Sequence, residues 1–195
     1  MMIVKEGDVN PTAPGGRVEH ASDLFVAIVE KLLTQRMLDE SFDQQVTPSQ
    51  LVALRYLSLN ESSLMSDVAE GLGVSFPAAT KTIDRLVKKD LASRSEDPHD
   101  RRVVRIRLTD LGRPLVADIH RERDRRFNRV LEKLDGEARE ALNKGMESFI
   151  SAAIEDEETA QSICLHCGSQ HHDECPVKVA YLRFTRAGKA AAIEA

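Results

Sequence analysis

The chain has 195 residues, of which 42% are hydrophobic, a length and composition typical of one globular domain with a small appendage. Its 27 lysines and arginines are outweighed by 32 aspartates and glutamates, and the net charge of -5 excludes a uniformly basic coat for nucleic acid. The uncharged apolar runs are too short to span a membrane, and the acidic N-terminal segment lacks the apolar core of a signal peptide. We therefore expect a cytoplasmic protein with no membrane partner.

The N-terminal part of the chain predicts an arm followed by two helices. Residues 1–20 contain prolines and glycines without an apolar period, which predicts a flexible arm. Apolar residues then recur at spacings of three and four over residues 22–38, which predicts an amphipathic helix. The segment 47–50 (TPSQ) predicts the start of a second helix, because Thr47 can cap it and Gln50 can complete a capping box.

Residues 64–90 predict two short helices joined by a tight turn. Glycines 71 and 73 interrupt the first helix, and Ser75 can cap the second. The apolar positions of the second helix recur at helical spacing: Ala79, Ile83, Leu86 and Val87. Because its opposite face is polar, the segment is a candidate helix-turn-helix.

A strand pattern follows the second of these helices. The apolar period changes to two over residues 103–108, which is typical of a half-buried strand. Residues 91–96 can pair with it across the turn-rich segment 97–100. The sequence therefore predicts a small β-hairpin.

Two longer helices are predicted after the hairpin. Thr109 can cap the first, and Gly136 separates it from the second, which ends at an acidic hinge over residues 155–158. The expected fold class is mainly α-helical with a small β-hairpin wing (α+β).

Positive charge gathers between Phe76 and Arg107, where nine basic and five acidic residues leave a local charge of +4. One interpretation of this charge is a solvated helix face beside a solvated turn, with no binding function. The functional interpretation is a footprint for the phosphate backbone of duplex DNA, with the helix in the major groove and the hairpin in the minor groove.

Two motifs lie in and beside this basic stretch. Residues 75–86 (SFPAATKTIDRL) form the first, and residues 97–102 (DPHDRR) followed by residues 108–112 (LTDLG) form the second. Together with the order of the helices, they resemble the recognition helix and the wing of the MarR family of dimeric winged-helix regulators. The resemblance covers residues 22–155.

The resemblance implies a winged helix-turn-helix protein that is dimeric through its N- and C-terminal helices. Its expected partners are double-stranded DNA, a second copy of the chain and a small-molecule effector. The implied function is that of a transcriptional regulator, with repression favoured, acting as a homodimer on pseudo-palindromic operators under a metal, redox or small-molecule signal.

The family's DNA-contacting positions transfer to this chain residue by residue. The implied contact residues are Ser75, Pro77, Ala78, Thr80, Lys81, Arg85 and Arg101. Asp100 and Arg102 are expected to pair and to hold the shape of the wing. Phe76 replaces the family's more usual polar residue; it would contact a thymine methyl group or pack locally, and we favour packing.

All three cysteines of the chain lie between residues 164 and 175. Cys164 and Cys167 have the spacing of a metal knuckle, whose turn directs two thiolates at one point. Cys175 would be the third ligand and His172 the fourth, with His171 as the alternative to His172. Such a set favours a tetrahedral zinc ion, and a segment this short is expected to need the metal in order to fold.

Three other interpretations of the cysteines stay open. They are a free Cys/His tail, an iron–sulfur cluster, and a redox switch formed by Cys164 and Cys167. The predicted domain layout is a flexible arm (1–20), a MarR-like DNA-binding and dimerisation domain (21–155), a Cys/His metal-binding module (160–178) and a C-terminal tail (179–195).

An enzymatic function is not expected. The sequence lacks the glycine-rich phosphate loop, the His-Glu-x-x-His pattern and the Gly-x-Ser-x-Gly pattern. The alternatives to a regulator are a zinc-dependent or thiol enzyme, and a zinc-knuckle interaction module on a winged-helix scaffold.

Overall fold

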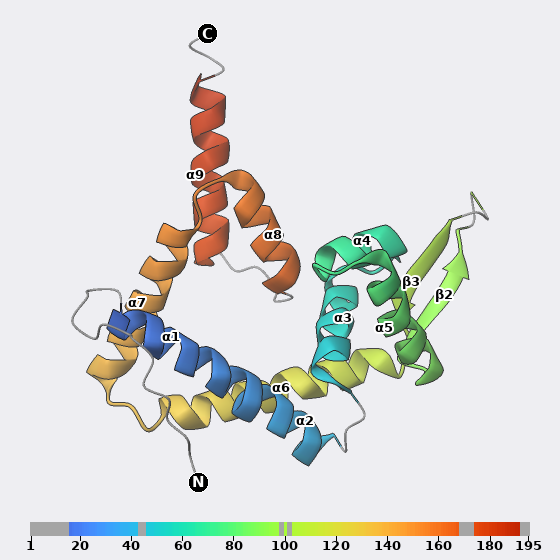
Figure 1. Cartoon of the computed structure of the whole chain (residues 1–195), viewed down its shortest axis with the longest axis horizontal. Helices are drawn as coiled ribbons and strands as arrows, with labels where there is room; N and C mark the ends of the chain where they lie inside the picture. The colour runs from blue at the N-terminus through green and yellow to red at the C-terminus, as the bar shows by residue number, and fades with distance from the viewer. Residues whose placement is uncertain (1–15, 43–45, 98–99, 101–102, 168–173, 192–195) are drawn as a thin grey trace. The chain divides into compact units, whose positions relative to one another are not determined.

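The structure is a computed structural model that describes residues 16–42, 46–97, 100, 103–167 and 174–191 (Figure 1). The chain divides into two units, one up to Gln45 and the other from Val46, and each is described by itself. In the described ranges, no helix is both long enough and apolar enough to cross a membrane.

The N-terminal unit contains one continuous helical run. It consists of α1 (Gly16–Ile28), the π-helical segment η1 (Val29–Gln35) and α2 (Arg36–Ser41). The run includes the amphipathic helix predicted over residues 22–38. It begins earlier than expected, so the last five residues of the predicted 1–20 arm are helical, and the rest of that arm lies outside the described residues.

The second unit opens with α3 (Pro48–Leu59), which begins as its sequence predicts. The Thr47 hydroxyl accepts a hydrogen bond from the Gln50 amide at 3.3 Å, and the Gln50 side-chain oxygen accepts one from the Thr47 amide at 3.2 Å. This reciprocal pair is the predicted capping box. The apolar stripe of the helix is buried, as expected: Leu51, Leu54 and Leu57.

The predicted helix-turn-helix is present as α4 (Met65–Gly71) and α5 (Phe76–Lys88), which pack against each other. The turn between them contains Gly73 at a φ of 63°. Glycine adopts this left-handed conformation without the steric cost that a Cβ would add, which lets the chain reverse within four residues.

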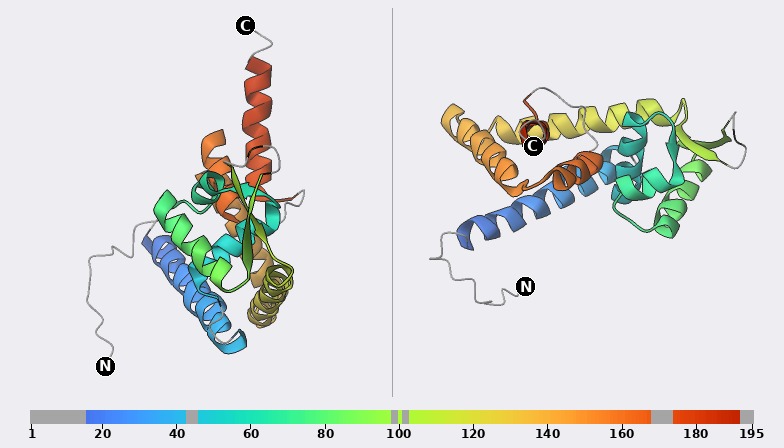
Figure 2. Two further views of the ribbon diagram at one scale, coloured as in Figure 1. Left: turned by 90° about the vertical axis from the view of Figure 1, so that its right-hand side faces the viewer. Right: turned by 90° about the horizontal axis from the view of Figure 1, so that it is seen from above.

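A three-stranded antiparallel sheet adjoins the helix-turn-helix. The predicted hairpin is formed by β2 (Ala92–Glu96) and β3 (Val104–Leu108), and Figure 2 shows it extending beyond α5. The two-residue strand β1 (Ser63–Leu64) pairs with the other edge of β3, so that the strand order is β1-β3-β2. Periodicity did not predict β1, because two residues are too few to show an alternation.

The two long helices are α6 (Gly112–Leu131) and α7 (Gly136–Ala153). Thr109 holds the start of α6, as predicted: its hydroxyl accepts from the Gly112 amide at 3.0 Å and donates to the Asp90 carbonyl at 2.6 Å. The same hydroxyl therefore ties the first turn of α6 to the chain just after α5.

The acidic segment 155–158, predicted as a hinge, lies partly between two helices and partly in the second. Glu155 and Asp156 lie between α7 and α8 (Glu157–Cys167), and α8 begins at Glu157. The Asp156 carboxylate accepts a hydrogen bond from the Thr159 amide at 2.7 Å, and this bond lowers the pKa of Asp156. Carboxylates stabilise the N-terminal end of a helix, which favours the start of α8 within this acidic run.

The last helix, α9 (Pro176–Ala191), crosses the predicted boundary between the 160–178 module and the 179–195 tail. The apolar stripe of α9 continues from Val177 to Phe184, on both sides of that boundary. A small core joins α8, α9 and the end of α7: Ile154, Ala160, Val177 and Ala180, with Ile150, Cys164, Cys175, Tyr181 and Phe184 packed against them. The buried residues of this core lie outside the cysteine segment 164–175, whose need for a metal in order to fold stays a prediction.

The close packing of Gly112 generates a test of this fold. A Cβ built on Gly112 would lie 2.1 Å from the backbone carbonyl oxygen of Leu91, whereas one built on Gly136 meets nothing within 4 Å. Gly112→Ala should lower the free energy of unfolding by about 1–3 kcal/mol, since the backbone must shift. Gly136→Ala should change it by less than about 1 kcal/mol. Urea unfolding followed by circular dichroism checks both, and equal effects would contradict the packing described.

Candidate nucleic-acid interface

Helix α5 has one buried face and one exposed face. Ala79, Ile83 and Leu86 are 0% exposed, and the helix contacts α3, α4 and β2. The predicted inward stripe is confirmed for these three residues and is wrong for Val87, which is 36% exposed because it lies at the margin of the stripe. This burial determines which residues of α5 face away from the protein.

The residues predicted to contact DNA lie on the exposed side of α5 and at its start. The exposed ones are Ser75, Pro77, Ala78, Lys81 and Arg85. Thr80 is half-buried, and its hydroxyl donates to the Phe76 carbonyl one turn earlier at 2.9 Å. With its proton engaged inside the helix, the Thr80 hydroxyl offers acceptor lone pairs to an incoming group.

Phe76 corrects one expectation. The sequence favours local packing for this side chain, but it is 55% exposed at the first position of α5. Local packing is wrong because the core-facing stripe of the helix begins three residues later, at Ala79. An exposed aromatic ring therefore lies beside Pro77 and Ala78 on the predicted DNA-facing surface.

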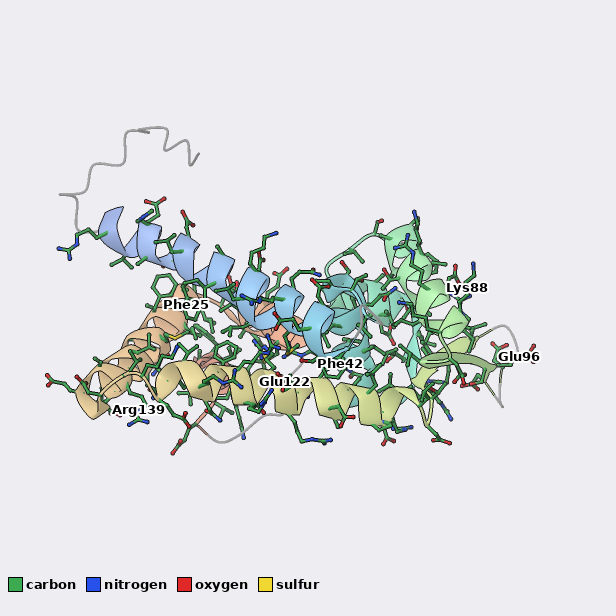
Figure 3. All side chains as sticks on the ribbon, turned by 90° about the horizontal axis from the view of Figure 1, so that it is seen from below. Phe25, Phe42, Lys88, Glu96, Glu122 and Arg139 are labelled. Atoms are coloured by element: carbon green, nitrogen blue, oxygen red, sulfur yellow. The ribbon has the colours of Figure 1, made fainter. Side chains whose placement is uncertain are left out.

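The charges of α5 fall into two groups. Asp84 forms an ion pair with Arg94 of β2 at 2.7 Å, which fastens the helix to the hairpin. Lys81, Arg85 and Lys88 are exposed, and none of them has an ion-pair partner in the part of the chain that the structure describes. Lys88, at the end of α5, is labelled in Figure 3. These three cations are placed to neutralise an external anion.

The turn end of the wing is held by a pair that sequence reasoning missed. The Asp97 carboxylate is buried and accepts hydrogen bonds from the Arg105 side chain and, at 3.3 Å, from the Asp100 amide. Arg105 also donates to the Ser62 carbonyl, at 3.4 Å, in the loop before β1. The only sequence signal was an acidic residue at the start of a turn, which does not identify a partner eight residues away.

Part of the predicted wing lies outside the described residues. Arg101, expected at the wing tip, and Arg102, expected to pair with Asp100, are in this group. Asp100 itself accepts a backbone hydrogen bond from the Val103 amide at 2.9 Å. The DNA contact of Arg101 and the Asp100–Arg102 pair stay predictions.

The cysteines occupy helix ends. Cys164 and Cys167 lie in the last turn of α8, so the predicted knuckle turn is wrong: a spacing of three also places two residues on one side of a helix. Cys175 directly precedes α9. Among the described residues, no group of three potential ligands is close enough to hold a metal ion. His171 and His172 lie outside the described residues.

This arrangement of helices and sheet can be compared with known proteins. A family model described as the MarR family matches residues 44–103. The HTH-type transcriptional repressor MdtR of Bacillus subtilis is 38% identical over 86 residues, which are 44% of this chain and 55% of that protein. The chain therefore spans little more than half the length of this relative.

Two further matches extend over more of the known protein. The transcriptional regulator AdcR of Streptococcus pyogenes is 31% identical over 110 residues, which are 55% of this chain and 74% of that protein. The crystal structure of the YusO protein of Bacillus subtilis, 28% identical, matches with a TM-score of 0.57 over 70% of this chain and 96% of that one. The sequence identity, the winged helix-turn-helix and the antiparallel sheet agree, and the chain belongs to the MarR family.

Proposed function

We propose that this protein is a transcriptional regulator that binds duplex DNA through α5 and the β2–β3 wing. The observation that carries the proposal is the exposed cationic face of α5, with Lys81, Arg85 and Lys88 opposite the buried stripe. Such a helix fits the major groove, and its cations neutralise backbone phosphates. The name of the relative MdtR favours repression. The relatives found are named regulators, and we propose no enzymatic activity.

We propose that the regulator acts as a homodimer. Neither α1 nor α7 buries a single residue within one chain. Both expose large apolar side chains: Val18, Leu24, Phe25, Val26 and Ile28 on α1, and Leu142, Met146 and Phe149 on α7. Apolar surface of this kind is typical of a face that another protein covers. A twofold dimer requires pseudo-palindromic DNA with half-sites about 10 bp apart.

The cationic face of α5 gives the first test of this function. The protein should retard a duplex from the region upstream of its own gene in a gel-shift assay. Lys81→Ala and Arg85→Ala should each weaken binding to all sequences and reduce the slope of log affinity against log salt by about one unit, because each lost cation releases fewer counterions. Arg101→Ala is expected to do the same.

The control for these variants is Lys133→Ala, which removes an exposed lysine outside α5 and the wing. Its salt slope should match that of the unchanged protein, and light scattering should give the same dimer mass for all variants. A monomer that shifts no promoter fragment would contradict both the DNA-binding and the dimer proposals. Unchanged affinity of both α5 variants at moderate salt would contradict the placement of α5 at the phosphates.

The exposed ring of Phe76 supports a second proposal, an apolar contact with a thymine methyl group in the major groove. Replacing each operator thymine in turn by deoxyuridine removes only that methyl. One replacement in each half-site should weaken binding of the unchanged protein, and the same replacement should have no effect on Phe76→Ser. Fluorescence anisotropy measures the affinity of each of the two proteins for the thymine duplex and for the deoxyuridine duplex. An equal loss of affinity in both proteins would show that Phe76 does not contact the methyl group.

We also propose zinc binding at the C-terminal cysteines. Its support is chemical: Cys164, Cys167 and Cys175 are soft ligands at the helix ends that flank residues 168–173, where His171 and His172 occur. Elemental analysis of protein purified under reducing conditions should find one zinc per chain, and none in the Cys164→Ser, Cys167→Ser double variant. Retention of the metal in that variant would contradict the site, and visible absorption would indicate an iron–sulfur cluster instead.

A further inference from the structure

The α8–α9 hairpin lies outside the 44–103 stretch that the MarR family model matches. The two helices pack side by side around their own small apolar core (Figure 1). Two of the residues that pack against this core are cysteines, Cys164 from the last turn of α8 and Cys175 from the residue before α9. The hairpin therefore brings thiols of two different helices to one place.

Cys164 and Cys175 pack against the same apolar core. Both side chains are partly buried, whereas Cys167 is exposed. Burial raises the pKa of Cys164, and the charges of the nearby Cys175 and Cys167 thiols raise it further. Cys164 and Cys175 thus pack against one small core, and a disulfide between them would connect α8 to the start of α9.

The thiol-bearing end of α8 also contacts the DNA-binding part of the chain. The Arg55 guanidinium of α3 donates a hydrogen bond to the Cys167 carbonyl at 2.6 Å, and α8 contacts both α3 and α4. Burial lowers the pKa of Arg55, in agreement with its position between helices. Because α3 in turn packs against α5, two contacts lead from the cysteines to the recognition helix.

We propose that Cys164 and Cys175 are an oxidation site: a hydroperoxide converts them to a disulfide that joins α8 to α9 and weakens DNA binding through the Arg55–Cys167 contact. The inference rests on the DNA-binding function proposed above. The zinc proposal uses the same sulfurs in their reduced state, and the disulfide removes them as metal ligands.

The chemistry balances with one hydroperoxide as the oxidant. One thiol attacks the peroxide, the O–O bond breaks, an alcohol or water leaves, and the sulfur becomes a sulfenic acid. The second thiol then attacks that sulfur, the S–O bond breaks and water leaves as the S–S bond forms. Two thiols and one hydroperoxide thus give one disulfide, one alcohol or water, and one further water.

The disulfide can change the contact between α8 and α3. It holds two Cα atoms within about 4.4–6.8 Å of each other, which constrains the last turn of α8 against the first turn of α9. The Cys167 carbonyl belongs to that last turn of α8. A Cys164–Cys167 disulfide, the switch that the sequence left open, joins residues of one helical turn and connects no second element.

The test uses the full chain, reduced and with its zinc content measured and then removed by a chelator. After treatment with hydrogen peroxide, peptide mapping should find Cys164 linked to Cys175. Fluorescence anisotropy on the promoter duplex should show a loss of affinity of about 5-fold or more, reversed by dithiothreitol. Mapping that finds no Cys164–Cys175 link, or a link without a change in affinity, overturns the inference.

Four variants separate the steps. Cys164→Ser and Cys175→Ser should each abolish both the link and the response to peroxide, while the matched control Cys167→Ser keeps both. Arg55→Gln should form the link and lose the response, with thermal unfolding used to confirm that it folds. A response that persists in Cys175→Ser, or disappears in Cys167→Ser, overturns the assignment of the pair.

The assay distinguishes this inference from the proposed function itself. If the reduced protein fails to bind DNA, the proposed function fails, and peptide mapping still decides whether the two thiols join. If the reduced protein binds DNA and the oxidised protein binds equally well, only the oxidation switch is lost.

Discussion

The burial of one narrow stripe of α5 is the constraint on which the proposed DNA-facing surface depends. Ala79, Ile83 and Leu86 have no exposed surface, so the rotation of the helix about its axis is settled by the core. Successive residues of an α-helix differ by about 100° around that axis, and the cations Lys81 and Arg85 therefore have no freedom to turn inward. Packing of three apolar side chains thus decides which charges reach a ligand.

The wing takes its position from a few polar contacts with the same core. The Asp84–Arg94 ion pair fastens β2 to α5, and the Thr109 hydroxyl fastens the start of α6 to the chain after α5. An exposed ion pair is worth at most about 1 kcal/mol, whereas a buried carboxylate such as Asp97 must be satisfied by hydrogen bonds. The Asp97–Arg105 contact at the turn end of the hairpin is therefore the more constraining of the two pairs.

Helix α3 connects the different parts of the second unit. It contacts α4, α5, α6, β3 and α8, and it supplies Arg55 to the end of the hairpin that bears the cysteines. An event in the C-terminal hairpin can alter DNA binding only by a difference in free energy between two arrangements of such contacts. Helix α3 packs against both α5, the proposed recognition helix, and the C-terminal hairpin, which makes it the physical link between the two.

The sequence by itself determined the local elements: the capping box of α3, the two helices around the glycine turn, the inward stripe of α5 and the pairing of β2 with β3. Each depends on residues a few positions apart, so periodicity and capping chemistry are sufficient to predict it. Only the tertiary structure placed the exposed ring of Phe76, paired Asp97 with Arg105, and brought Arg55 to Cys167, 112 residues away in the chain. Two cysteines three positions apart occur both in a knuckle turn and in a helix, so the spacing alone does not distinguish the two. The residues next to a side chain in sequence do not indicate which distant residue it contacts in the fold.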